Sequence, residues 1–373
     1  MAGATAKRVT ASGTVLPHGT RRGRGACSNV SGRFERERRE PVDDGWTEEA
    51  DTDSEPAPHL TEVRDEPARS IITRNDSPDI SFDQSINPYR GCEHGCSYCY
   101  ARPSHAYLGH SPGLDFETKL YAKPGAARLL EAELAKPGYV PSTIALGSNT
   151  DPYQPIERER RITRDVLQVL AKARHPVGIV TKSSLVVRDI DVLAPMARDG
   201  LVKVALSVTT LDRRLARSME PRAAAPHRRI EAMSALADAG IPVAVMVAPV
   251  VPTLNDHEIE RILAVARDAG ASEAGYVLLR LPRELKDLFR EWLVEACPDR
   301  ADRILKVLRE MHGGRDYLAD FGVRQSGAGP YARQIAARFS LALGRLGMNQ
   351  RRPPLRTDLF VPPVPAGGQL PLL

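Results

Sequence analysis

Three cysteines lie within eight residues of one another, in a segment that reads Asn-Pro-Tyr-Arg-Gly-Cys-Glu-His-Gly-Cys-Ser-Tyr-Cys-Tyr from position 87 to position 100. Cys92, Cys96 and Cys99 have the spacing Cys-x3-Cys-x2-Cys. Three thiolates on one short loop can hold three irons of a cubane cluster and leave the fourth iron open to a small molecule, whereas ferredoxin sequences supply a fourth cysteine. Only Cys27 and Cys297 remain, and both are distant in sequence. The loop therefore predicts a [4Fe-4S] cluster with one open iron.

Zinc is the alternative metal for this loop, but structural zinc sites take four Cys or His ligands in tetrahedral geometry. His94 is the neighbouring candidate for a fourth ligand, and its place between two of the cysteines makes that geometry awkward. Gly91 and Gly95 flank the first two cysteines and permit tight turns and close backbone approach. Tyr98 and Tyr100 bracket the third cysteine, where their rings can stack on adenine or shield the cluster.

The composition is typical of a folded protein in a reducing compartment. The chain has 373 residues, of which 42% are hydrophobic and 27% charged, enough for a sizeable core. The first residues show no apolar signal-peptide region, and the longest apolar run, residues 241–252, is too short to span a bilayer. We therefore expect a cytoplasmic protein with no membrane partner, in which clustered thiols bind metal. The net charge of +5 permits a polyanionic partner.

The chain divides into four stretches by composition. Residues 1–68 are predicted to form a disordered tail, because the basic, Gly/Ser-rich first part and the acidic second part contain few aliphatic side chains to bury. Residues 69–298 are expected to form the core domain. Residues 299–350 are expected to form a helical extension, and the Pro-rich residues 351–373 an extended tail.

Within the core, short Val/Ile/Ala-rich runs alternate with amphipathic stretches of helix length. The expected strands are 142–148, 177–183, 202–210, 242–251 and 274–281, after a first strand near 81–88. The expected helices are 125–136, 162–174, 187–199, 226–239, 256–269 and 284–297, followed by 300–312 and 331–346. This alternation predicts an α/β fold in which helices cover a parallel sheet. About six β/α units indicate a partial (β/α)6 TIM-like barrel.

The cysteine spacing, with an aromatic residue before the third cysteine, a strand before the loop and a β/α series after it, resembles the radical S-adenosylmethionine (SAM) superfamily. The resemblance covers Asn87 to Leu281 and makes residues 69–298 the radical SAM core. It implies that the three cysteines bind the cluster and that the amino and carboxylate groups of SAM chelate the open iron. One electron from a flavodoxin- or ferredoxin-like donor would then cleave SAM to methionine and a 5′-deoxyadenosyl radical, which takes hydrogen from the substrate.

Within this superfamily the chain resembles the spore photoproduct lyase-like branch. The shared segments are Cys-Ser-Tyr-Cys-Tyr at 96–100, Gly-Ser-Asn-Thr-Asp-Pro-Tyr at 147–153, Thr-Lys-Ser at 181–183 and Leu-Ser-Val-Thr-Thr at 206–210. The resemblance puts Asn149 where those lyases carry a hydrogen-donating cysteine, and an amide N–H cannot replace a thiol in that role. Residues 148–150 also replace the usual Gly-Gly-Glu of the family. We therefore expect a lyase- or transferase-like reaction on an unidentified substrate, with nucleic acid as one candidate class.

Polar residues follow three of the expected strands, at the edge where barrel-like sheets carry their active sites. The resemblance implies that residues after the second strand bind the SAM ammonium, that Lys182 meets the SAM carboxylate, and that Ser207 and Thr209 bind ribose hydroxyls or carboxylate. The residues after the second strand are Ser148, Asn149, Thr150 and Asp151. A capped turn, a solvated lysine and a buried strand serine are the structural alternatives.

Two further features suggest partners. Arg222 and its neighbours Arg213, Arg214 and Arg217 form a basic loop suited to a carboxylate, to a nucleic-acid phosphate or simply to solvent. The chain end from Gln369 to Leu373 resembles the short peptide that docks bacterial DNA sliding clamps.

Two functional classes follow from these features. The first is a radical SAM enzyme that acts on nucleic acid, a small molecule or a peptide. The second is a non-catalytic Fe–S or zinc protein that uses its metal for structure or redox sensing. The polar residues at the strand ends favour the enzyme.

Overall fold

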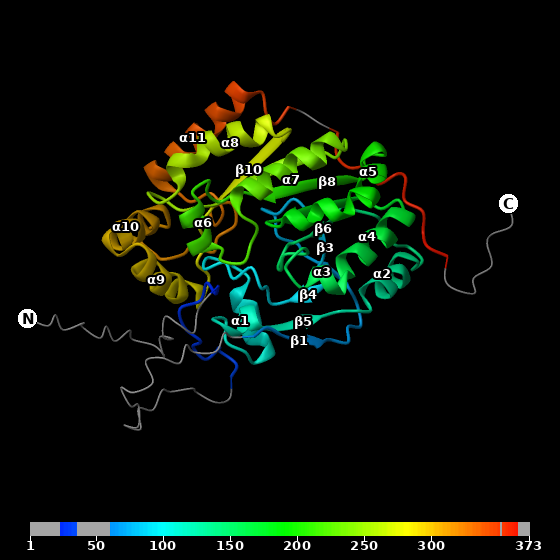
Figure 1. The fold of residues 1–373 in the computed structure, drawn as a ribbon, viewed down its shortest axis with the longest axis horizontal. Helices are drawn as coiled ribbons and strands as arrows, with labels where there is room; N and C mark the ends of the chain where they lie inside the picture. Colours follow the sequence, from blue (N-terminus) through cyan, green and yellow to red (C-terminus); the bar gives the residue numbers. More distant parts are fainter. Residues whose placement is uncertain (1–22, 36–59, 351–352, 365–373) are drawn as a thin grey trace, which may run out of the picture.

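A seven-stranded sheet organises the protein, whose computed structural model describes residues 23–35, 60–350 and 353–364 (Figure 1). Its strand order is β10-β9-β8-β7-β6-β3-β2. The strands are β2 (Ile72–Arg74), β3 (Gln84–Ile86), β6 (Ile144–Leu146), β7 (Val177–Thr181), β8 (Val202–Ser207), β9 (Val243–Val250) and β10 (Glu273–Leu278). The strands from β3 to β10 pair in parallel, and β2 pairs antiparallel at the edge. The predicted α/β fold with a parallel sheet and six β/α units is confirmed. The strands follow one another in a linear order, which is consistent with a partial barrel.

The register of the sheet brings the carboxyl ends of its strands to one edge. Ile86 pairs with Leu146, Leu146 with Ile179, and Leu206 with Val245. Because these parallel strands are aligned side by side, the loops that follow β3, β6, β7 and β8 emerge next to one another. The cysteine loop, residues 91–100, follows β3 after the short strand β4 (Tyr89–Arg90) and so lies at this edge.

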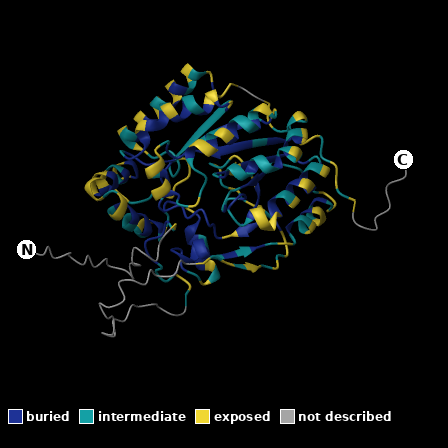
Figure 2. Ribbon diagram, in the orientation of Figure 1, coloured by how far each residue is buried: buried dark blue, intermediate teal, exposed yellow. Residues whose placement is uncertain are grey.

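Helices cover the sheet where the sequence predicts them, with ends within a few residues of the expected positions. Their inward faces are aliphatic; in the helix at 162–172, Val166, Leu167 and Leu170 are fully buried. The buried residues follow the strands and the loops at the carboxyl edge, while the outer helix faces are exposed (Figure 2). The covering helices are α2 (Ala126–Leu134), α4 (Ile162–Lys172), α5 (Ile190–Arg198), α7 (Pro226–Asp238) and α8 (Ile259–Asp268).

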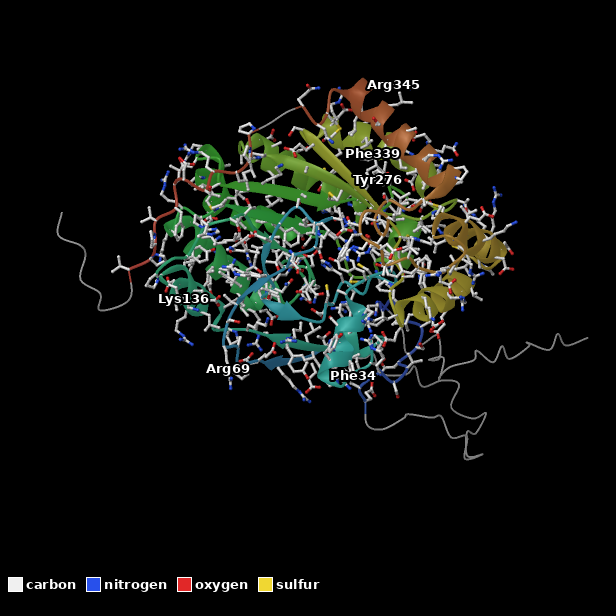
Figure 3. The ribbon with its side chains drawn as sticks, turned by 180° about the vertical axis from the view of Figure 1, so that it is seen from behind. Phe34, Arg69, Lys136, Tyr276, Phe339 and Arg345 are labelled. Carbon is white, nitrogen blue, oxygen red and sulfur yellow. The ribbon has the colours of Figure 1, made fainter. Side chains whose placement is uncertain are left out.

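The carboxyl-terminal helices continue the core. They are α9 (Leu285–Ala296), α10 (Ala301–Met311) and α11 (Gly329–Leu346), as predicted for 284–297, 300–312 and 331–346. Tyr276 of β10 packs against Phe339 of α11, with ring centroids 4.7 Å apart (Figure 3). Residues 353–364 run without helix or strand across the ends of α4 and α5, where Val361 N–H donates to the carbonyl of Ala173.

Short elements connect these layers. A three-stranded sheet has the order β1-β5-β4, with β1 at Glu62–Asp65 and β5 at Lys119–Ala122. The short helices are η2 (Arg102–Leu108), α1 (Asp115–Thr118), α3 (Glu157–Arg160), η3 (Ser184–Asp189), α6 (Arg213–Met219), η4 (Asp256–Glu258) and η5 (Pro298–Arg300). No helix in the described part of the chain is both long and apolar enough to cross a membrane.

The prediction of a disordered tail over residues 1–68 is wrong for two segments. Residues 60–68 include β1, which pairs with β5. Residues 23–35 pack on the core, where Ala26, Cys27 and Ser28 are buried. Backbone hydrogen bonds and close glycine contacts hold these segments. The prediction relied on their low content of aliphatic residues, which gives no information about such contacts. The rest of the predicted tail lies outside the described residues.

Candidate active site

The cysteine loop folds back on itself through its two glycines. Gly91 and Gly95 both adopt positive φ, at 73° and 66°. A Cβ atom on Gly91 would lie 2.6 Å from a Leu120 side-chain carbon and 2.9 Å from the Phe116 carbonyl oxygen, so the loop approaches its neighbours too closely for another residue. Cys92 N–H donates to that carbonyl at 2.9 Å. The glycines thus let the loop turn as the sequence predicted.

The three thiols are enclosed together. Cys92 and Cys96 are buried and Cys99 is half-buried. Burial raises the pKa of Cys96 to about 12, against the opposing effect of Lys182. Burial also raises the pKa of Cys92 well above its ordinary value, with further contributions from Asp151, Cys96 and Cys99. Buried thiolates that repel one another need a compensating positive charge, which iron supplies, so the donor set fits a cluster.

A single metal ion fits less well. In residues 23–35, 60–350 and 353–364, no group of three or more His, Cys, Asp or Glu side chains is arranged to hold a metal ion. A cubane spreads its thiolate ligands over three irons, so it does not require them to converge on one point. The His94 imidazole, the fourth zinc ligand considered from sequence, lies instead beside the Asp151 carboxylate, with Nδ1 3.3 Å from Oδ2.

A buried ion pair contacts the backbone of the cysteine loop. The Arg102 guanidinium binds the Glu117 carboxylate and donates through Nε to the Cys96 carbonyl oxygen at 2.9 Å. Burial by itself would lower the pKa of Arg102, but Glu117 outweighs that effect and raises it. Both side chains are essentially excluded from solvent. The pair therefore fixes the backbone of the second cysteine.

The amino-terminal segment 23–35 closes over the same pair. The Glu117 carboxylate accepts hydrogen bonds from the N–H groups of Gly25 at 3.0 Å and Ala26 at 2.8 Å. A Cβ atom on Gly25 would lie 1.7 Å from the Gly95 carbonyl oxygen. Cys27, distant in sequence, belongs to the same buried apolar cluster as Cys96. The segment is thus part of the wall around the cysteine loop.

The turn after β6 is organised by Asn87, a residue that sequence reasoning missed. Its side-chain oxygen accepts from the N–H groups of Asn149 at 3.0 Å and Thr150 at 3.3 Å, and its amide donates to Ser148 Oγ at 3.1 Å. The Thr150 hydroxyl is buried and donates to the Tyr89 carbonyl oxygen. These predicted cofactor-binding residues therefore share one turn, in which Thr150 also has a structural partner.

Asp151 and Lys182 connect that turn to the end of β7. The Asp151 carboxylate accepts from Thr181 Oγ1 at 2.7 Å and from Lys182 N–H at 2.8 Å. Burial would raise the pKa of Asp151, but the adjacent His94 and these hydrogen bonds hold it well below its usual range. The Lys182 ammonium lies 5.8 Å from the centre of the Tyr98 ring. Burial would lower the pKa of Lys182, and Cys96 and Glu220 outweigh that effect.

Glu220 and Arg229 form a second buried network with residues at the end of β8. Neither of these two residues was identified from the sequence. The Glu220 carboxylate accepts from the Tyr98 hydroxyl, from Thr209 Oγ1 and from the Arg229 guanidinium. Arg229 also donates to the Ser207 carbonyl oxygen at 2.9 Å. Tyr98, Ser207 and Thr209 are therefore brought together. Glu220 lies two residues from Arg222 in the basic loop noted from sequence, and its position there gave no sign of burial.

Tyr100 and Arg280 lie at the more exposed side of the site. Tyr100 is 45% exposed, and its hydroxyl donates to the Ser148 carbonyl oxygen. The Arg280 guanidinium lies over the Tyr100 ring, 5.1 Å from its centre. Arg280 comes two residues after the end of β10, a position typical of site residues. It lies inside the expected strand 274–281 and was therefore not identified from the sequence.

Comparisons with known proteins agree with this geometry. The family model of the radical SAM superfamily matches residues 86–266. The uncharacterized protein Rv2578c of Mycobacterium tuberculosis is 34% identical over 291 residues, which are 77% of this chain and 82% of that protein. The uncharacterized protein MJ0683 of Methanocaldococcus jannaschii is 30% identical over 176 residues, 46% of this chain and 62% of that protein.

A solved structure shares the fold. Spore photoproduct lyase complexed with dinucleoside spore photoproduct superposes with a TM-score of 0.54 at 16% identity, over 76% of this chain and 79% of that one. The family model covers β3 to α8, which includes the cysteine loop and the strand ends that surround it. The chain therefore belongs to the radical SAM superfamily.

Proposed function

We propose that this protein is an enzyme that binds a [4Fe-4S] cluster through Cys92, Cys96 and Cys99 and reductively cleaves SAM to a 5′-deoxyadenosyl radical. One observation carries the proposal: three thiols, two of them buried and one half-buried, share one loop at the sheet edge where the strand-end polar residues gather. The cluster and SAM supply the radical chemistry, and the protein supplies binding, orientation and exclusion of water.

The chain's own residues suit these tasks. The Lys182 ammonium is beside Tyr98 and Cys96, where it can bind the carboxylate of SAM. The Tyr98 ring is fixed through its hydroxyl by Glu220 and shields the loop from water. Tyr100 presents an exposed ring on which adenine can stack, and the polar turn at Ser148 and Asn149 borders it.

The test is anaerobic reconstitution with iron and sulfide, reduction with dithionite, and measurement of 5′-deoxyadenosine formed from SAM. Cys92→Ala, Cys96→Ala and Cys99→Ala should each lose both the cluster absorbance and the product. Cys297→Ala is the matched control, because this thiol is half-buried beyond α9 and should leave both intact. A fully loaded cluster that yields no 5′-deoxyadenosine would instead favour a structural or redox-sensing role.

We further propose a nucleic-acid substrate, in preference to a small molecule or a peptide. The net charge of +5 and the fold shared with a lyase that binds a dinucleoside photoproduct support this choice. Asn149, whose amide lies 3.5 Å from Ser104 Oγ, cannot return a hydrogen atom as a thiol does. The proposed reaction is lyase- or transferase-like and does not draw its final hydrogen from residue 149.

The same proposal includes a flavodoxin- or ferredoxin-like one-electron donor and a cytoplasmic location, where thiols remain reduced. Reduction of the cluster by such a carrier in place of dithionite tests the donor. Product formation with dithionite but not with the carrier would show that the carrier, and not the radical chemistry, was wrongly assigned.

A further inference from the structure

A cavity of 720 Å³ opens beside the cysteine loop. It lies between the segment that follows β7 and the first turns of α7, and α3 contributes Arg158 to its wall. His94 reaches it from the cysteine loop. Its lining includes neither Tyr98 nor Lys182, so it is separate from the site proposed for SAM. Its volume is in the range of small-molecule binding sites.

Positive charge dominates the cavity wall. Arg158, Arg222 and Arg228 all line it, and Glu231 is the one carboxylate among the lining residues. Arg228 pairs with Glu231 at 2.9 Å, and Arg222 pairs with Glu93 at 3.1 Å. Within the described ranges no carboxylate forms an ion pair with Arg158. The wall therefore keeps excess positive charge and favours an anion, with guanidinium geometry that matches phosphate.

The rest of the wall is mixed: small apolar residues such as Ala224 and Ala235 lie beside the serines Ser183 and Ser184 and the larger apolar Leu185. The amino terminus of α7 borders the cavity, and its N-cap, Ala225, provides no side-chain hydrogen bond. Pro226, the first residue of the helix, has no N–H, so the helix offers the N–H groups of the residues that follow it; such groups lack partners within the helix and attract anions. Arginines, uncapped N–H groups and a partly apolar wall together fit a phosphate that is attached to a larger, partly apolar group.

We propose that this cavity binds a nucleotide phosphate, either within a nucleic-acid strand or in a free nucleotide. This inference rests on the proposed nucleic-acid substrate and assigns the cavity as the site that binds it. Arg222 connects this place to the cluster loop, because its N–H donates to the His94 carbonyl oxygen at 3.2 Å. A nucleotide held here is thus anchored next to the loop that carries the cysteines.

The test measures binding of a short fluorescein-labelled single-stranded DNA to the anaerobically reconstituted holoenzyme by fluorescence anisotropy. In the double variant Arg158→Glu/Arg228→Glu, affinity should fall about tenfold or more, because two phosphate contacts become repulsive. The matched control, Arg303→Glu/Arg333→Glu, reverses two exposed charges on α10 and α11 and should change affinity less than about twofold. Competition with adenosine monophosphate distinguishes a free nucleotide from a strand.

A second variant tests the cavity without changing charge. Ala235→Phe fills it from the half-exposed face of α7 and should weaken binding as the arginine variant does. Three results would overturn the proposal: no binding of either probe by the wild type, equal losses in the arginine variant and its control, or full binding by Ala235→Phe. Loss of flavodoxin-driven reduction with unchanged DNA binding would also overturn it and assign the surface to the electron donor.

The two proposals fail separately. Formation of 5′-deoxyadenosine without substrate should be the same in all these variants, since none of the altered residues borders the SAM site. A wild type that binds DNA at the cavity but forms no 5′-deoxyadenosine would contradict the proposed chemistry and leave the binding site standing.

Discussion

The Arg102 guanidinium and the Glu117 carboxylate form a buried ion pair beneath the cysteine loop and connect three parts of the chain that are distant in sequence. Arg102 holds the Cys96 carbonyl oxygen, and Glu117 holds the backbone of Gly25 and Ala26. In these hydrogen bonds both side chains bind backbone atoms and not the thiols. The pair is therefore a positioning element, through which the amino-terminal segment and the cysteine loop are mutually fixed.

Arg102→Ala should destabilise the protein by about 3 kcal/mol or more, because it leaves the Glu117 carboxylate buried without its partner. It should also lower the iron content, since the Cys96 backbone loses its donor. Urea unfolding of the apoprotein and iron per chain after reconstitution measure the two effects.

The matched control for that change is Arg356→Ala, which breaks an exposed pair with Asp358. Because solvent screens an exposed pair, it should change the free energy of unfolding far less than Arg102→Ala does, and leave the iron content unchanged. Similar losses in both variants would show that the burial of the Arg102 pair has no special role.

Gly25→Ala should displace the amino-terminal segment, because the added Cβ would lie 1.7 Å from the Gly95 carbonyl oxygen. The three nearest atoms that it would meet, in Gly95 and Ser97, all belong to the backbone, so none can rotate away as a flexible side chain would. We expect a loss of about 1–3 kcal/mol and faster bleaching of the reconstituted cluster in air. Absorbance decay after exposure to oxygen is the measurement.

Gly344→Ala serves as the comparison, because nothing lies within 4 Å of the added carbon and the residue is in α11. It should stabilise the protein by up to about 1 kcal/mol and leave bleaching unchanged. If Gly25→Ala bleaches at the wild-type rate, the segment does not protect the cluster.

The strands and the cysteine loop could be predicted because both leave local patterns. Aliphatic runs of strand length, separated by amphipathic stretches, predicted the six parallel strands of the large sheet, β3, β6, β7, β8, β9 and β10, but not the small sheet that contains β5. The cysteine spacing needed no three-dimensional information either. The helix ends at Gly240 and Gly270 carry the positive φ angles of 76° and 90° expected of helix-terminating glycines.

The supporting residues could not be predicted, because their partners are far away in the chain. Asn87 acts on a turn much later in the chain, since Asn149 follows it by 62 residues. In the sequence Glu220 resembles a residue of a charged surface loop, because its partners Arg229 and Tyr98 come from other parts of the fold. The segment 23–35 has little apolar surface and is held by hydrogen bonds and close glycine packing, so a rule based on composition assigns it to a tail.

Removal of Gln369 to Leu373 tests the expected contact with a DNA sliding clamp. These residues lie outside the described part of the chain, so the prediction rests on their sequence alone. The truncated protein should lose clamp binding in surface plasmon resonance and keep SAM cleavage. Equal clamp binding with and without the five residues, or no binding by the full chain, would contradict the expectation.

Acid should destabilise the protein through His175. Burial lowers the pKa of this imidazole from 6.5 to about 4. Its Nε2 lies 2.9 Å from the Tyr139 hydroxyl, and its ring packs against Phe360. Between about pH 6.5 and pH 4 the unfolded chain binds a proton that the folded protein excludes. The stability contributed by the neutral imidazole is therefore complete above pH 6.5 and is lost as the pH falls toward 4.

His175→Gln removes this titration and keeps a neutral polar side chain, so its unfolding free energy should depend less on pH. The pH-dependent difference from the wild type should approach about 3 kcal/mol between neutral and acid conditions. Urea unfolding of the apoprotein across that range measures it. His257→Gln, at an exposed position of η4, should keep the wild-type slope. If His175→Gln and the wild type lose stability in parallel, another group accounts for the acid sensitivity.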